Sequence, residues 1–168
     1  MIALNIPDRK EFTKGLFIGN IFDHFLLREA SITTYCSFTI DGSLHKNFYS
    51  EEEQRDMELN SRNLALWQEC KPFCFSIIKG KHTPLHFKFV FQLSQKDMEH
   101  FLISSGVPLA AEDVFGLFLN ISFDGNALIC TTGTSQRTFT LDKSLDNSWD
   151  TWIMNFLKEN SILTEKIS

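Results

Sequence analysis

The chain has 168 residues, and its 16 Lys and Arg against 21 Asp and Glu give a formal net charge of −5. This length suits one folded domain, and a composition that is 43% hydrophobic and 22% charged excludes a disordered or collagen-like chain. No apolar run reaches the roughly 18–20 residues of a membrane helix and no signal-peptide pattern opens the chain, so we expect a cytosolic protein whose four cysteines are thiols.

The first third of the chain predicts a short strand, a helix, an extended strand and its hairpin partner, at residues 2–6, 7–17, 32–40 and 44–48. Phe12 and Leu16 lie four residues apart and predict the buried face of the helix. Asp41-Gly42 is a turn dipeptide in which the glycine tolerates positive φ, and we place the hairpin turn there.

The middle of the chain, residues 50–79, predicts a helical insert. Ser50 and Glu53 have the spacing of a capping box, which marks the start of a helix. A second helical stretch covers residues 63–79, with a break expected at Pro72 because proline removes a helix hydrogen bond. Residues 73–78 alone also fit a short buried strand, since periodicity does not separate the two.

The second half predicts a strand, a helix, a three-stranded meander and a final helix, at residues 85–93, 94–106, 117–123, 127–132, 137–141 and 144–157. Ser94 begins the first of these helices as its N-cap, and Asp124-Gly125 makes the first turn of the meander. The final helix carries an apolar stripe at helical spacing, made of Leu145, Trp149, Trp152, Ile153, Phe156 and Leu157.

These elements predict a single α+β domain over residues 1–168, built from antiparallel sheet and helices. The two halves of the chain also look alike, because residues 2–49 and 85–141 both read as a strand, a helix and further strands. In this alignment Lys10 corresponds to Lys96, and the two Asp-Gly dipeptides lie 83 residues apart. We therefore expect a duplicated β-α-β-β-β unit with the helical insert between its copies.

The segments FKFVFQL, QKDMEHFL and LFLNISFDGNALICTTGTS, within residues 85–141, resemble one module of a DNA sliding-clamp domain. Residues 1–49 resemble the same module more weakly. This resemblance implies a clamp-like fold that contacts nucleic acid or replication proteins, although known clamps join several such domains in a ring. Over its whole length the chain is similar to an uncharacterised family of small clostridial proteins, which implies no activity.

One pattern has the composition of a metal site. Cys70, Cys74, His82 and His86 form C-x3-C-x7-H-x3-H, and zinc binds thiolates and imidazoles in a tetrahedron. The spacing differs from that of a zinc finger, and Cys74 lies among phenylalanines as a small core residue would. We therefore expect no bound metal, and no motif calls for a cofactor.

Three segments carry cations that would suit nucleic acid or another anion. The helix predicted at 7–17 contributes Arg9, Lys10 and Lys14, the helix predicted at 94–106 contributes Lys96, and the basic turn 79–82 contributes Lys79 and Lys81. Lysines in such a turn also complement the C-terminus of a preceding helix, so the turn has a structural explanation as well.

The sequence favours a non-catalytic cytosolic domain that acts through a protein partner or through self-association, without a membrane. The alternative is a clamp-like module that contacts nucleic acid or replication proteins. A small hydrolase-type enzyme that uses His45, His82 or His86 is the third interpretation, although no set of catalytic residues can be named.

Overall fold

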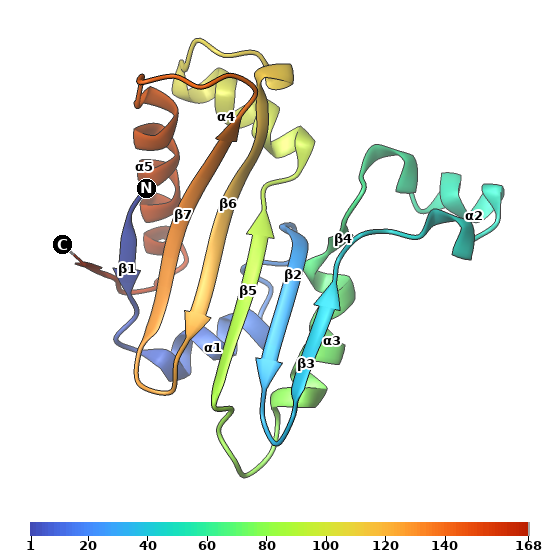
Figure 1. The fold of residues 1–168 in the computed structure, drawn as a ribbon, viewed down its shortest axis with the longest axis vertical. Coiled ribbons are helices and arrows are strands. Elements are labelled where there is room, and N and C mark those ends of the chain that lie inside the picture. The colour runs from blue at the N-terminus through green and yellow to red at the C-terminus, as the bar shows by residue number, and fades with distance from the viewer. Residues whose placement is uncertain (168) are drawn as a thin grey trace.

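An eight-stranded antiparallel sheet forms the framework of the protein, as the computed structural model shows for residues 1–167 (Figure 1). Its order is β3-β2-β5-β6-β7-β1-β8, and β4 pairs with β2 beside β3. The strands are β1 (Ala3–Asn5), β2 (Leu26–Thr33), β3 (Ser37–Asp41), β4 (Ala65–Leu66), β5 (His86–Gln92), β6 (Val114–Phe123), β7 (Leu128–Gln136) and β8 (Glu165–Ile167). The predicted α+β class with an antiparallel sheet is confirmed.

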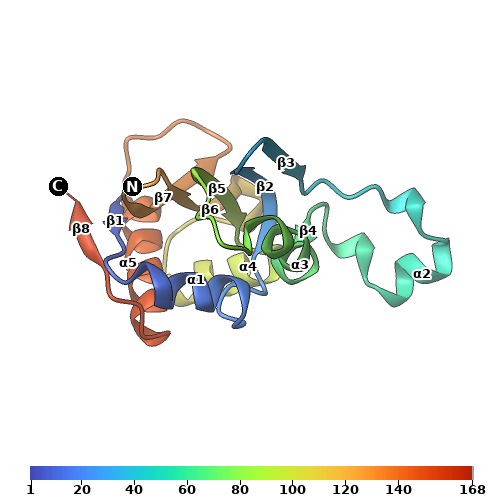
Figure 2. The ribbon, with the colours of Figure 1, turned by 90° about the horizontal axis from the view of Figure 1, so that it is seen from below.

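Four of the five α-helices cover one face of this sheet and leave the other face open (Figure 2). The helices are α1 (Arg9–Phe17), α2 (Glu51–Asp56), α3 (Trp67–Ile78), α4 (Gln95–Ser105) and α5 (Ser144–Glu159), with short 3-10 turns η1 (Lys46–Phe48), η2 (Leu59–Ser61) and η3 (Ala111–Asp113). Only α2 stands away from the sheet. Among residues 1–167, no helix combines the length and apolar character that crossing a membrane requires.

Three predicted helix starts are confirmed because their capping side chains make the expected bonds, whereas the helix expected from residue 63 begins only at Trp67. The Asp8 carboxylate accepts a hydrogen bond from the Glu11 N–H at 3.1 Å, which opens α1. Ser50 and Glu53 cap α2 reciprocally, and Ser94 caps α4. These bonds satisfy backbone donors that the first helical turn leaves without intrahelical partners.

Alternation along the strands separates a core face from an open face. On β5, Phe87, Phe89 and Phe91 are buried under the helices, whereas His86 and Lys88 are exposed on the open side. The α5 stripe lies on the core side as expected: Leu145, Trp149, Ile153 and Leu157 are buried, and Trp152 and Phe156 are half-buried.

The predicted single strand at 32–40 is wrong, because the chain reverses within it. β2 and β3 form a hairpin whose turn is Thr34-Tyr35-Cys36, closed by a 3.0 Å hydrogen bond from the Thr34 N–H to the Cys36 carbonyl. No glycine or proline marks this turn. The even-numbered residues are the apolar ones both just before and just after this turn, so the alternation of apolar and polar residues continues through the turn without a break.

The hairpin predicted at Asp41-Gly42 is therefore also wrong, and residues 44–48 are not its second strand. Gly42 follows the end of β3 with a φ outside the positive region. A Cβ at this position would overlap the carbonyl oxygen of Leu27, so the glycine permits a close approach of two backbones rather than a turn.

Two further expectations fail. Helix α3 continues through Pro72 without a break, so residues 73–78 are helical and not a strand. Residues 137–141 are a loop with Phe139 and Leu141 exposed, because β7 itself extends to Gln136. The meander after α4 consequently has two strands, β6 and β7.

The structure does not confirm the duplicated clamp-like unit. Helices α1 and α4 do lie on the same face of the sheet, but near its opposite ends (Figures 1 and 2). Asp124-Gly125 closes the β6–β7 hairpin with Gly125 at φ 96°, whereas Asp41-Gly42 lies where the chain leaves the sheet. The predicted correspondence of the two Asp-Gly turns is wrong.

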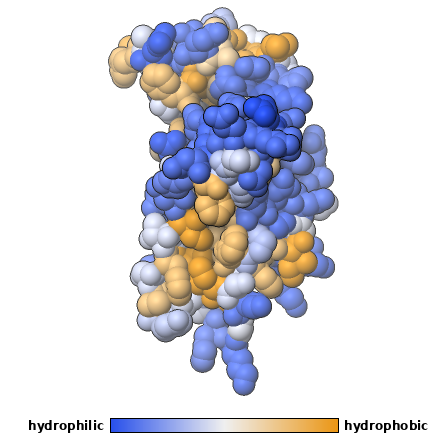
Figure 3. Space-filling view, turned by 90° about the vertical axis from the view of Figure 1, so that its right-hand side faces the viewer, coloured by the Kyte–Doolittle hydropathy of each residue, from blue (hydrophilic) through white to orange (hydrophobic). Residues whose placement is uncertain are grey.

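The chain between β3 and β4, residues 42–64, projects from the sheet as an arm that carries η1, α2 and η2 (Figure 1). At its base the Leu44 N–H donates to the Asn63 carbonyl at 2.9 Å, and Ser43 and Leu64 form an isolated bridge. Viewed from this side, the arm is largely hydrophilic, and apolar side chains gather below it over β3 and α3 (Figure 3).

Candidate functional site

A groove of about 780 Å³ lies between α1 and the turn that follows α3. These elements lie in the lower part of the molecule in Figure 1, whereas the arm projects sideways from its upper half. Strand β5 and the β6–β7 turn complete the groove. Its lining consists of Arg9, Lys10, Thr13, Lys14, Phe17, Ile18, Phe75, Ile78, Lys79, Gly80, His82, Thr83, Pro84, Phe87, Phe123, Gly125 and Leu128.

The rim of the groove is cationic. Lys10 and Lys14 are four residues apart on α1 and so project from one side of that helix, while Lys79 follows the last turn of α3 across the groove. All three side chains are exposed, and within residues 1–167 none of them forms an ion pair. No acidic residue lines the groove, although the whole chain has a net charge of −5.

The floor of the groove is apolar and packed. Phe17 lies 6.2 Å from Phe75 and 6.4 Å from Phe87 between ring centroids, and Phe87 lies 5.4 Å from Phe123. Phe17, Phe87 and Phe123 are each at most 7% exposed, so they support the floor without offering open ring faces. Ile18 is 68% exposed at the edge, and Phe75 and Ile78 are half-buried in the lining.

Arg9 is held at one end of the groove. Its guanidinium donates to the Asn126 carbonyl at 3.1 Å and lies 5.8 Å from the centre of the Phe123 ring. The neighbouring Asp124 carboxylate accepts hydrogen bonds from the backbone N–H groups of Ala127 and Asn126, at 2.8 Å each, which keep its pKa below the usual value. The Asp124 carboxylate therefore serves to hold the β6–β7 turn in place.

The structure brings together most of the cations proposed from the sequence, but not all of them. Arg9, Lys10, Lys14 and Lys79 line the groove; Lys81 is exposed in the same basic turn without lining it. Lys96 lies elsewhere, in a depression of about 890 Å³ between the arm and α4 that also contains acidic residues. The sequence did not reveal that α1 and the basic turn face each other, because their meeting depends on how α1 and α3 pack.

The four residues of the candidate metal pattern lie in different environments. Cys74 is buried in α3 and Cys70 is half-buried one turn before it, whereas His82 and His86 are exposed. Burial raises the pKa of Cys74 to about 12, which makes it a poor source of thiolate. Across residues 1–167, no three His, Cys, Asp or Glu side chains converge as metal ligands.

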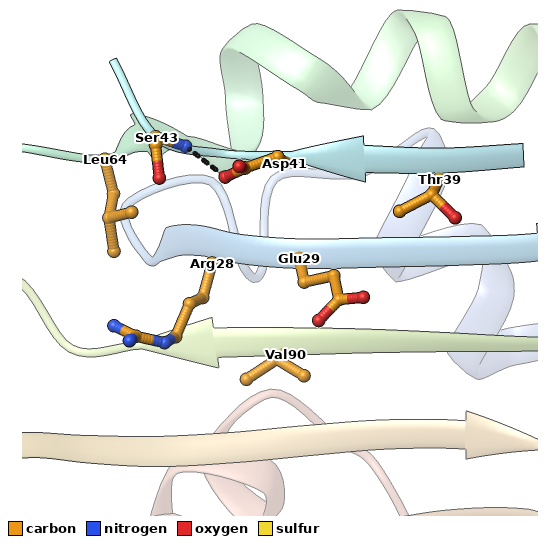
Figure 4. Close-up of a pocket in the computed structure, with 7 residues that line it drawn as sticks. All are labelled: Arg28, Glu29, Thr39, Asp41, Ser43, Leu64 and Val90. Atoms are coloured by element: carbon orange, nitrogen blue, oxygen red, sulfur yellow. Dashed lines mark hydrogen bonds between the residues drawn. The ribbon is translucent and has the colours of Figure 1, made fainter.

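A shallow depression of about 490 Å³ on the open face of the sheet also contains charged residues, but they are of both signs: Arg28, Glu29 and Asp41 (Figure 4). The Asp41 carboxylate accepts the Ser43 N–H at 2.9 Å, which lowers its pKa. Arg28 donates to the Gln92 side chain at 3.2 Å and lies over the Phe118 ring. Because its charges are of mixed sign, this depression suits an anion less well than the groove, which has no acidic residue in its lining.

The histidines considered for an enzyme do not share one site. His82 lines the groove, His86 is exposed at the start of β5, and His45 is exposed on the arm. The groove contains no cysteine, aspartate or glutamate that would pair with His82. Its chemistry is that of binding an anion beside an apolar surface.

Comparison with known proteins places the chain in a family. No curated protein and no solved structure matches it significantly. Residues 15–165 match the Family of unknown function (DUF5721), a range that extends from within α1 to the beginning of β8. This agrees with the expectation of an uncharacterised family, and the chain belongs to this family of unknown function.

Proposed function

We propose that this protein is a non-catalytic interaction domain of the cytosol, and that its groove binds an acidic segment of a protein partner. The observation that carries the proposal is the set of unpaired cations, Lys10, Lys14 and Lys79, around a groove without a carboxylate. The four free cysteines support a reducing compartment.

A short acidic segment suits this groove better than a long polyanion. The rim attracts negative charge locally, whereas the net charge of −5 repels an extended chain of phosphates at longer range. The aliphatic edge at Ile18 and Ile78 also offers burial to an apolar side chain of the partner. Acidic residues beside one apolar anchor therefore match both properties of the groove.

Nucleic acid is the second candidate, and the meeting of α1 with the basic turn favours it. Four cations that line one groove would neutralise phosphates and make binding strongly dependent on salt. Against this, Phe17, Phe87 and Phe123 are too buried to stack on bases, and Lys96 does not join the cluster.

The test measures fluorescence anisotropy of three probes titrated with the protein: an acidic peptide that contains a phenylalanine, its glutamine counterpart, and a single-stranded oligonucleotide. The acidic peptide should bind, and Lys10→Glu/Lys14→Glu should weaken it by about tenfold or more, as close interfacial charge pairs do. Lys158→Glu/Lys166→Glu changes the net charge by the same amount at two exposed lysines that do not line the groove; it is the matched control and should have little effect.

Binding of the oligonucleotide alone would replace the proposal with the nucleic-acid alternative. Equal affinity for the acidic and glutamine peptides would show that the groove does not recognise negative charge. An affinity for the acidic peptide that is unchanged in the Lys10→Glu/Lys14→Glu variant would show the same.

A further inference from the structure

We propose that the occupant of the groove is the arm of a second copy of this chain, so that the protein associates with itself through charge complementarity. This inference rests on the proposed function, since it names the acidic partner that the groove binds. It joins two features that the fold leaves separately unsatisfied, the cationic groove and the acidic arm.

The arm has the composition that the groove requires. Residues 48–58 contain five acids, Glu51, Glu52, Glu53, Asp56 and Glu58, against the single base Arg55. In the described part of the chain, no ion pair involves Glu52 or Asp56. Both are exposed, and their spacing of four residues places them on one side of α2.

An apolar anchor precedes these acids. Phe48 is 81% exposed, and within residues 1–167 its one aromatic partner is Tyr49, in a T-shaped arrangement with a centroid distance of 5.0 Å. A large exposed aromatic residue beside charged residues is typical of an interface anchor. Placed at the aliphatic edge of the groove near Ile18 and Ile78, it would bring the α2 carboxylates close to the rim.

The spacing of the charges is also complementary. Glu52 and Asp56 on α2 repeat the separation of Lys10 and Lys14 on α1, so two helices laid side by side can pair both sets. A cationic patch that meets an acidic patch steers association and makes it sensitive to salt.

The contact must be made between two molecules. The arm projects from the upper half of the molecule in Figure 1, away from α1 and the turn after α3, which form the groove, so an arm does not reach its own groove. Two copies satisfy both sites if they exchange arms, and a series of copies satisfies them head to tail.

Sedimentation velocity from about 1 µM to about 1 mM tests the inference, since this range covers weak and moderate association. The wild-type chain should associate with rising concentration, and added salt should weaken the association. Phe48→Ala should weaken it by about tenfold or more, which is typical of an anchor residue. Phe139→Ala is the control, since Phe139 is 91% exposed outside both the arm and the groove.

A charge exchange provides the sharper test. Glu52→Lys/Asp56→Lys sets the lysines of α2 against Lys10 and Lys14, whereas Lys10→Glu/Lys14→Glu sets the glutamates of α1 against Glu52 and Asp56. Each variant alone should be monomeric, because like charges then face each other at the paired positions. An equimolar mixture of the two should associate, because each α2 then meets an α1 of opposite charge at these positions. Thermal unfolding of each variant checks that these exposed substitutions leave the fold intact.

A wild-type chain that stays monomeric up to the highest concentration would overturn self-association, and so would a mixture that does not recover it. If an acidic peptide still binds the groove in that case, the proposed function stands and only the identity of the partner is wrong. If neither peptide nor arm binds, both proposals fall.

Discussion

Trp67 provides the most demanding test of how the walls of the groove are held together. It is the first residue of α3, is completely buried, and donates its indole N–H to the Leu16 carbonyl of α1 at 3.0 Å. Its ring lies 5.1 Å from Phe89 and 5.1 Å from Phe91 beneath the sheet. This one side chain therefore fastens both helices that flank the groove to the same core.

Trp67→Phe keeps an aromatic ring but removes the indole N–H, so the effect can be estimated from the contacts. Leaving the buried Leu16 carbonyl without this donor costs about 1–3 kcal/mol. The smaller ring also leaves a partial cavity next to Phe89 and Phe91, which costs about 1 kcal/mol more. We expect a total loss of about 2–4 kcal/mol in the free energy of unfolding.

Urea denaturation measures this loss directly, and a thermal melt should show a midpoint lower by about 4–16 °C for a chain of this size. Trp152→Phe is the matched control, because Trp152 is half-buried and its contacts are stacked rings rather than a buried N–H bond. A change of less than about 0.5 kcal/mol in Trp67→Phe, the range of an ordinary surface substitution, would refute the reasoning that this bond joins α1 to α3.

Three further outcomes are expected. Gly42→Ala should lower the free energy of unfolding by about 1–3 kcal/mol because its Cβ meets a backbone carbonyl, whereas Gly133→Ala, whose nearest neighbour is 3.9 Å away, should be tolerated in the same urea assay. A thiol reagent at about pH 8 should label Cys36 in the native protein but spare Cys74 and Cys130, since burial raises the pKa of both to about 12; rapid native labelling of either one would contradict this. The melting temperature should fall below about pH 4, because Asp41, Asp124 and Asp142 accept backbone N–H bonds that lower their pKa values in the folded state. Their contribution to stability is complete above the unfolded pKa of about 4 and is lost as pH falls through the folded pKa. A melting temperature that stays constant from pH 7 to about pH 3 would be inconsistent with these shifts.

The sequence predicted correctly those helices and strands that are determined by interactions between residues close together in the chain. The N-caps Asp8, Ser50 and Ser94 work through bonds within one turn, so their residue types and spacing suffice to locate α1, α2 and α4. The apolar stripe of α5 and the alternation of β5 are likewise consequences of burial on one face.

Elements decided by long-range contacts were predicted less well. Gly42 resembles a turn glycine in the sequence, but its role depends on the carbonyl of Leu27, which β2 brings against it. The β2–β3 turn contains no residue that favours positive φ, so nothing local distinguishes it from a continuous strand. Helix α3 accommodates Pro72 within a helix whose first residue, Trp67, is fixed in the core.

In the candidate site, too, the residue types were predictable from the sequence, but the long-range contacts that bring them together were not. The residue types of the rim were identified in the sequence as two separate basic segments, and the pattern included Lys10 and Lys79 but also Lys96, which lies elsewhere. What joins α1 to the basic turn is the packing of α1 against α3, through the Trp67 bond and a 2.6 Å ion pair between Lys71 and Asp23. Neither contact follows from periodicity.

The distribution of charge supplies the remaining argument for an external partner. Lysines that approach one another across a groove repel, and within residues 1–167 no carboxylate forms an ion pair with Lys10, Lys14 or Lys79. The acids of α2 repel one another in the same way at the tip of the arm. At a given ionic strength both repulsions persist in the single folded chain, and both would decrease if the two surfaces met. Added salt would screen them in the monomer as well as screening the attraction between copies, so the free energy of association should rise toward zero with ionic strength while the monomer itself becomes more stable.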